Sequence, residues 1–360
     1  MPSSFDIQAP VAELSSEAKK GAIQRQAQLT KPPGSLGVLE DIALMFAAWQ
    51  NKDKPMLSRI ALRIYAADHG VADPRREGAS VSAFPQEVTG QMIRNFSTGG
   101  AAISVLAGLQ DFDFEVLNLG TAQPLPDMPK VKQIQIVNGS ADFTRTPAMK
   151  ESELQRALLA GANSVPVSAQ LFIGGEMGIG NTTSASALLA GLFDMNGAIA
   201  AGRGTGVNDE GLASKVMAID QALELHRPNA SSSLDWLRCL GGLEIAALVG
   251  AYVRSAQLGI PVLVDGFITS VAAACAVQIN PKVRDWMLFS HCSAERAHRK
   301  VLELLDAEPL LNLGMRLGEA TGAAVAVPII QSALSMHSYM DTFDQAGVAT
   351  EAAAVSVSNG

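Results

Sequence analysis

AQLFIGGEMGIGNTTSASALLAG, residues 169–191, is a short apolar run that breaks into glycines and continues as a run of helix-forming residues. The apolar run is Leu171 to Ile173, and Asn181 and Thr182 stand just before the helix-forming run. This order predicts a strand, a tight loop and a helix start. Glycines let backbone N–H groups approach a ligand, and a helix N-terminus carries unpaired donors and partial positive charge. The loop therefore suits a phosphate, although a structural turn after a buried strand would contain the same glycines.

Glu176 lies inside this loop. An acid is unfavourable in an anion-binding loop unless it serves the ligand as well. A substrate that carries a phosphate and also a cationic or hydrogen-bond-donating part would satisfy both groups. We therefore expect the loop and Glu176 to belong to one binding site.

The composition narrows the class of protein. The chain has 360 residues, of which 48% are hydrophobic and 17% charged, enough for one large α/β domain with an appendage or for two domains. The small charged fraction favours a buried subunit interface. A net charge of −8 argues against a nucleic-acid partner. Cys239, Cys275 and Cys292 have no metal-ligand spacing, and the N-terminus has no signal-peptide pattern, so we expect a cytoplasmic protein without a bound metal.

One stretch is long enough to be compared with a membrane span. Residues 320–340 contain no side chain that is charged at pH 7. Pro328, Gln331 and several serines and histidines interrupt the stretch, and Arg316 and Glu319 stand just before it. A buried or interface helix is the better interpretation.

Short β-prone runs that end in small and polar residues recur along the chain. They predict strands at 59–67, 114–120, 132–140, 171–178, 260–267 and 285–293. Helical stretches separate them, such as 86–108, 151–161, 182–192, 209–226 and 242–257. The alternation predicts an α/β fold with a mostly parallel sheet and helices on both faces.

Ligands of such sheets bind beyond the carboxyl ends of the strands. The predicted ends supply these polar side chains: Asp68, His69, Asn138, Glu176, Asp265, Ser290, His291 and Ser293. His69 and His291 could act as bases, but fixing loop hydrogen bonds is the simpler role for both. Cys292 has no clear partner as a nucleophile and fits a small buried side chain.

The two ends of the chain are helical in pattern. Helices are predicted at 11–30 and at 36–50, the second capped by Ser35, and later at 296–305 and 322–339. The tail from Asp341 shows no clear periodicity.

A second glycine cluster, GRGTG at 202–206, precedes the predicted helix 209–226, which Asn208 or Asp209 could cap. The cluster does not follow an obvious strand, as a dinucleotide-binding fingerprint requires. Lys215 lies two turns into this helix, where most lysines are solvated.

A set of motifs stands in order between residue 31 and about residue 324. They are KPPGSLG (31–37), ADHGV (67–71), VSAFPQEVTGQM (81–92), GGEMGIGNTTSASA (174–187), GRGTG (202–206), VDGF (264–267), SHCSAE (290–295) and RLGEATGAA (316–324). Together they resemble one family, the nicotinate-nucleotide:dimethylbenzimidazole phosphoribosyltransferases of cobalamin biosynthesis. The resemblance implies a Rossmann-like sheet domain at 56–298, a small helical domain made of 1–55 and 299–360, and a homodimer.

The resemblance also implies a reaction and the residues that carry it. Nicotinate mononucleotide and 5,6-dimethylbenzimidazole would give α-ribazole 5′-phosphate and nicotinate. Glu319 matches the catalytic base of the family, and Ala320 stands where glycine is commoner, which would tighten the loop. The substrate-binding candidates are Gly178, Lys215, Ser293 and Arg316 for the phosphate, Glu176, Gly180 and Asn181 in the glycine loop, Asp265 in support, and Ser82, Phe84, Gln86 and Met92 for the azole.

This chemistry needs few protein groups. Nicotinate leaves C1′ as a neutral ring, so no general acid is required, and one carboxylate can take the proton that the azole loses. Because Glu319 precedes a long uncharged segment, we expect desolvation to raise its pKa toward neutrality. Attack opposite the departing ring inverts the anomeric centre from β to α. Neither a metal nor a redox cofactor has a task in these steps.

Two other functions are compatible with the glycine-rich motifs. A non-catalytic nucleotide-binding module would keep its function when Glu319 is replaced by glutamine. An NAD-linked dehydrogenase rests only on the glycine clusters and lacks a strand followed by GxGxxG and a helix.

Overall fold

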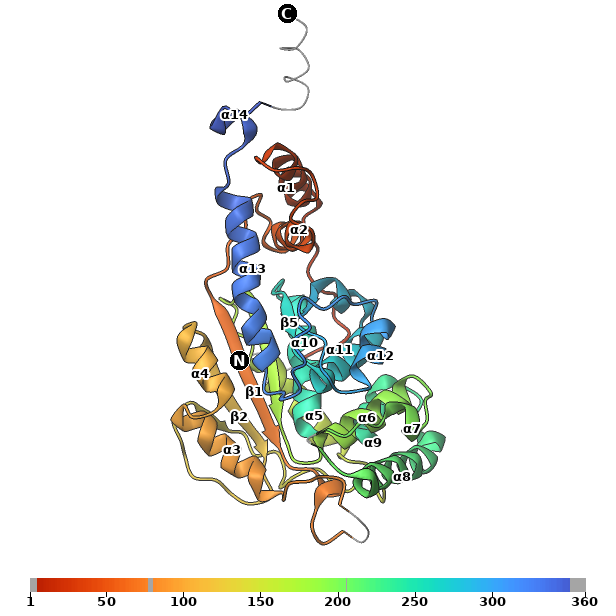
Figure 1. The fold of residues 1–360 in the computed structure, drawn as a ribbon. Helices are drawn as coiled ribbons and strands as arrows, with labels where there is room; N and C mark the ends of the chain where they lie inside the picture. The colour runs from red at the N-terminus through yellow and green to blue at the C-terminus, as the bar shows by residue number, and fades with distance from the viewer. Residues whose placement is uncertain (1–4, 77–79, 205, 350–360) are drawn as a thin grey trace, which may run out of the picture. The chain divides into compact units, whose positions relative to one another are not determined.

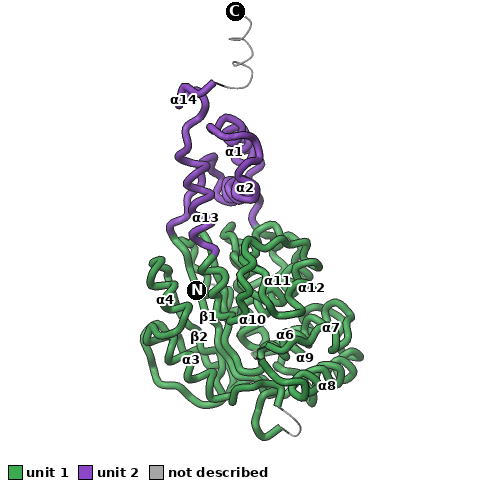
Figure 2. Tube along the Cα trace, in the orientation of Figure 1, with its two compact units in different colours: residues 1–11, 59–325 green, residues 12–58, 326–360 purple. Residues whose placement is uncertain are grey.

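The computed structural model describes residues 5–76, 80–204 and 206–349. Thr205 of the second glycine cluster and residues 350–360 of the predicted tail lie outside this part. The chain forms two compact units, residues 1–11 with 59–325 and residues 12–58 with 326–360 (Figure 2). The resemblance implies domain boundaries at 55/56 and 298/299, and these boundaries stay a prediction.

Within the described residues, the first unit contains a six-stranded sheet in the order β3-β2-β1-β4-β5-β6 (Figure 1). The strands are β1 (Ile60–Ala67), β2 (Asp113–Gly120), β3 (Val131–Gln133), β4 (Leu171–Met177), β5 (Val262–Val264) and β6 (Met287–Phe289). All neighbouring pairs are parallel. The strand order reverses direction between β1 and β4, the place where doubly wound sheets bind ligands. The predicted α/β fold with a parallel sheet is confirmed.

Helices connect the strands. They are α3 (Glu87–Thr98), α4 (Ala102–Leu109), α5 (Glu151–Asn163), α6 (Asn181–Leu192), α7 (Gly197–Ala200), α8 (Asp209–His226), α9 (Ser233–Leu240), α10 (Leu243–Gln257), α11 (Phe267–Ile279) and α12 (His298–Leu304). Figure 1 shows α3 and α4 on one side of β1 and β2 and α10 on the other. Strand β1 is buried along its whole length, as expected of a strand covered on both faces.

Three local predictions are wrong in detail. The predicted helix 86–108 is two helices, because Gly99 takes a left-handed conformation (φ +86°) that ends α3. Of the predicted strand 132–140, only 131–133 forms a regular strand, β3, and its continuation pairs just beyond the end of β1 at a single bridge between Ser140 and His69. Ser35 does not cap the next helix, which begins at Val38 after Gly37. Asn208 does cap α8, since its side chain accepts from the N–H of Gly211.

The second unit contains helices from both ends of the chain: α1 (Ser16–Gln28), α2 (Val38–Gln50), most of α13 (Thr321–Tyr339) and α14 (Phe343–Ala346). The guanidinium of Arg25 in α1 donates to the carbonyls of His337, Ser338 and Met340 at 2.7, 3.0 and 2.9 Å. Early and late segments are therefore joined within this unit.

Helix α13 starts in the first unit and continues in the second. Pro328 inside it has no N–H for the carbonyl of Ala324, and that carbonyl accepts from the Gln110 side chain at 3.0 Å instead. The helix matches the uncharged stretch at 320–340. In the part of the chain that the structure describes, no helix has both the length and the apolar character needed to cross a membrane.

Candidate functional site

A cavity of about 340 Å³ lies at the carboxyl ends of β4 and β5 in the first unit, within the size range of small-molecule sites. Its walls come from α3, the loop after β4, the start of α11, the loop after β6 and the segment before α13. The predicted site residues that line it are Phe84, Met92, Glu176, Gly178, Asn181, Asp265, Ser293, Arg316 and Glu319. Residues far apart in the sequence, including Gly178 and Glu319, therefore face one space.

The remaining predicted residues lie around this cavity but not in its lining. Gly180 forms the N-cap of α6 with a φ of +98°. The Ser82 hydroxyl accepts from the N–H of Phe84 at 3.2 Å. Gln86 donates to the carbonyl of His69 at 3.0 Å and lines another cavity, at the ends of β1 and β2. Lys215 is buried, and its Nζ donates at 3.1 Å to Thr182 Oγ1, a lining residue.

Glu319 is held by an unusual turn. Gly318, Glu319 and Ala320 have φ values of +85°, +60° and +64°, so three successive residues are left-handed. This conformation costs a non-glycine residue about 1–2 kcal/mol. Strain of this kind persists only where the surroundings determine the conformation, and it gathers at functional sites. The turn brings the Glu319 carboxyl to the end of β4, where Ala320 packs against Gly175.

Asp265 fixes the segment that follows this turn. Its Oδ1 accepts from the N–H of Ala323 at 2.8 Å, and its carboxylate also interacts with the N–H groups of Ala320 and Gly322. These are donors at the start of α13, which have no partner inside the helix. Burial raises the pKa of Asp265, while nearby His291 and these N–H groups lower it.

Buried acids repel each other at this end of the sheet. Burial and the neighbouring Asp265 raise the pKa of Glu319 to about 7. Burial, followed by repulsion from Asp265, Glu244 and Glu319, raises the pKa of Glu176 well above its usual range. The Asn181 side chain donates to Glu176. A carboxyl whose pKa lies near neutrality can accept a proton from a ligand at physiological pH.

Two basic side chains lie at this cavity, Arg316 in its lining and Lys215 behind the lining residue Thr182. Burial lowers the pKa of Lys215 to about 8, an effect that the charge of Glu295 partly offsets. Glu295 Oε2 accepts from the N–H of Gly204 at 3.1 Å. Arg316 is exposed at the cavity mouth. These groups, together with the N–H groups at the start of α6, can hold an anion.

His291 was expected to fix loop hydrogen bonds or to act as a base, and Cys292 to be a small buried side chain, whereas Glu295 and Leu317 were not singled out from the sequence. His291 and Glu295 line the cavity, as does the half-exposed Leu317, whereas Cys292 is half-buried beside the Ser293 carbonyl. Glu295 belongs to the SHCSAE motif and Leu317 to the RLGEATGAA motif, so membership of these motifs could have indicated both residues.

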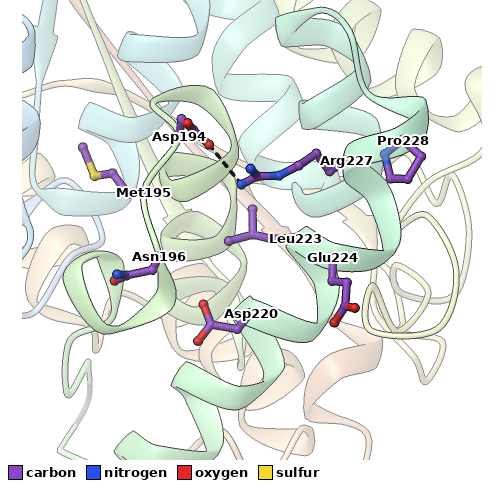
Figure 3. A pocket seen from close by; sticks show the side chains of 8 residues that line it. All are labelled: Asp194, Met195, Asn196, Asp220, Leu223, Glu224, Arg227 and Pro228. Atoms are coloured by element: carbon purple, nitrogen blue, oxygen red, sulfur yellow. Dashed lines mark ion pairs between the residues drawn. The ribbon is translucent and has the colours of Figure 1, made fainter.

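Figure 3 shows another cavity, near the end of α6 and along α8. Asp194 and Arg227 form an ion pair of 3.0 Å beside it. None of the residues predicted for the site lines it. Nine of the predicted residues instead line the cavity at the ends of β4 and β5.

The chain is similar to proteins of known family. A family model described as phosphoribosyltransferase matches residues 11–348. The nicotinate-nucleotide–dimethylbenzimidazole phosphoribosyltransferase of Xanthomonas axonopodis pv. citri is 54% identical over 92% of this chain and 94% of its own. The enzyme of the same name from Azotobacter vinelandii is 53% identical over 91% of this chain and 93% of its own.

Solved structures agree. The crystal structure of the nicotinate-nucleotide–dimethylbenzimidazole phosphoribosyltransferase of Thermus thermophilus superimposes with a TM-score of 0.85 at 40% identity, covering 93% of this chain and 99% of that one. A crystal structure of CobT from the same organism gives a TM-score of 0.87 at 42% identity, with 92% and 99% covered.

The left-handed turn predicts the outcome of a paired substitution. Gly314 and Gly318 both have positive φ, but a Cβ on Gly318 would lie 2.7 Å from Glu176 Oε1, whereas one on Gly314 would meet nothing within 4 Å. We expect Gly314→Ala to cost about 1 kcal/mol of stability and Gly318→Ala to cost more, because it also displaces a buried carboxyl. Thermal unfolding followed by circular dichroism compares them, and equal losses would contradict the described position of Glu176.

Proposed function

Because this chain belongs to the nicotinate-nucleotide–dimethylbenzimidazole phosphoribosyltransferase family, we propose that it transfers the phosphoribosyl group of nicotinate mononucleotide to 5,6-dimethylbenzimidazole or a related base. The products are α-ribazole 5′-phosphate and nicotinate. One observation carries the proposal at the level of residues: Glu319 and the glycine loop at Gly178 line the same cavity.

In this proposal Glu319 is the catalytic base. The azole attacks C1′ with the lone pair of one nitrogen and loses the proton of its other nitrogen to the Glu319 carboxylate. Nicotinate leaves as a neutral ring with the electron pair of the C1′–N bond, so its departure needs no proton. Attack from the opposite face inverts C1′ from β to α. A base poised near neutrality contributes about 10²–10⁴-fold to such a step.

The remaining site residues bind and orient. Gly178, Lys215, Ser293 and Arg316 hold the phosphate, with Gly180 and Asn181 at the start of α6 and Glu176 beside them. Fixing the phosphate places C1′ within reach of the azole, and such alignment supplies a large share of the acceleration. Phe84 and Met92 contact the azole from α3 and the segment before it, with Ser82 and Gln86 next to them. Asp265 supports the turn that presents Glu319.

We expect Glu319→Gln to lower kcat by about 10²–10⁴-fold while the KM for nicotinate mononucleotide changes little, because the amide keeps the shape but cannot take the proton. Release of nicotinate from nicotinate mononucleotide and dimethylbenzimidazole measures it. Glu308→Gln, an exposed glutamate outside the cavity, is the matched control and should behave as wild type. If Glu319→Gln retained its turnover, Glu319 would not be the catalytic base. If the wild-type protein were inactive with every azole and purine tested, a non-catalytic binding module would be favoured.

The pKa shifts predict a pH profile. Glu319 acts as a base only when ionised, so kcat should rise with pH and level off above about 7. The kcat/KM for nicotinate mononucleotide should fall again above about pH 8, as Lys215 loses its charge. Asp265→Asn removes a negative neighbour and should move the acid limb to lower pH. If the acid limb of the kcat profile did not shift in Asp265→Asn, a group other than Glu319 would control it.

We further propose that the chain forms a homodimer in the cytoplasm. The small charged fraction of 17% supports a buried interface. Light scattering on the purified protein should then give twice the chain mass of 37.6 kDa. A single chain mass at micromolar concentration would contradict the dimer without touching the proposed reaction.

A further inference from the structure

Asp68 and His69 follow directly after β1, and the proposed reaction leaves both without a task. They belong to the ADHGV motif at 67–71. Asp68 is 3% exposed and His69 is fully buried. Buried polar side chains are normally hydrogen-bonded, since they otherwise lose free energy of solvation. Their partners therefore indicate what they do.

The His69 ring lies between two segments of backbone. A Cβ on Gly178 would lie 3.3 Å from ring atoms Cδ2 and Nε2, and a Cβ on Gly242 would lie 2.3 Å from Cε1. Both glycines thus permit close contact with the imidazole. The ring Nε2–H donates to Oε1 of Glu244 at 2.7 Å, and Glu244 is fully buried in the first turn of α10. The hydrogen-bonded His69–Glu244 pair therefore packs against the glycine loop at Gly178.

Thr89 holds the same loop from α3. Its Oγ1 accepts from the N–H of Ile179 at 3.1 Å, and the side chain is fully buried. The Asp68 carboxylate accepts from the N–H of Ala122 at 2.7 Å. Burial raises the pKa of Asp68, and this hydrogen bond and the neighbouring Thr89 side chain offset part of the shift. The ends of β1 and β2 are thereby joined to the loop after β4.

We propose that Asp68, His69, Thr89 and Glu244 are positioning residues that hold the backbone of 178–180 in its phosphate-binding shape. None of the four is among the residues that line the cavity described above, so they act through the loop. The inference rests on the proposed function, in which this loop binds the phosphate of nicotinate mononucleotide. It gives the ADHGV motif a role at the point where the strand order reverses.

Thr89 offers a sharp test, because valine has its shape without the hydroxyl and serine keeps the hydroxyl. Thr89→Val leaves the N–H of Ile179 buried without an acceptor. We expect it to raise the KM for nicotinate mononucleotide about tenfold and the KM for dimethylbenzimidazole less than about twofold. Thr89→Ser should restore the first KM to within about threefold of wild type. Glu244→Gln should shift the same KM in the same direction as Thr89→Val.

The outcomes separate this inference from the proposed function. Wild-type turnover in the same assay tests the function, and an inactive wild type refutes that. With an active wild type, unchanged KM values in folded Thr89→Val and Glu244→Gln, or equal rises for both substrates, overturn the positioning role. So does a Thr89→Ser protein that behaves like Thr89→Val. If Thr89→Val does not fold, the KM values of Glu244→Gln alone decide.

Discussion

The site depends on the burial of three carboxyl groups, Glu176, Asp265 and Glu319, at one end of a parallel sheet. Burial raises the pKa of all three, and repulsion from neighbouring acids raises those of Glu176 and Glu319 further. What keeps the three acids together is a set of hydrogen-bond donors: Asn181 for Glu176, and the first N–H groups of α13 for Asp265. The same arrangement places one of the acids, Glu319, in a left-handed turn where its carboxyl faces the cavity.

Much of the fold could be predicted from local patterns. Local sequence patterns were sufficient for the apolar runs at 59–67 and 171–178, which form β1 and β4. The glycine loop after the second run leads into α6, as predicted. The break of 86–108 into two helices was missed because the glycine pair at 99–100 was read as part of one helix. Periodicity also overestimated the paired part of 132–140, since pairing depends on a neighbouring strand and not on the run itself.

The site was predictable in a different way. The motifs indicated Glu319 and Gly178 as candidates, which line one cavity, and the alternation of strands and helices indicated that the carboxyl ends of the strands would meet. The left-handed turn at 318–320 could not be predicted from the sequence, because alanine adopts this conformation only where the surrounding structure requires it. The packing of His69 between Gly178 and Gly242 likewise joins segments more than sixty residues apart, which no spacing in the sequence reveals.

Pro328 has a mechanical consequence for α13. The helix lacks one backbone hydrogen bond between Ala324 and Pro328, and its missing donor is replaced by the side chain of Gln110. A helix bends most easily where one of its backbone hydrogen bonds is missing. The interrupted hydrogen bond lies about one and a half to two and a half helical turns beyond Glu319. Any bend of α13 is therefore expected at Pro328, whereas its first turn is tied to Asp265 through the N–H of Ala323.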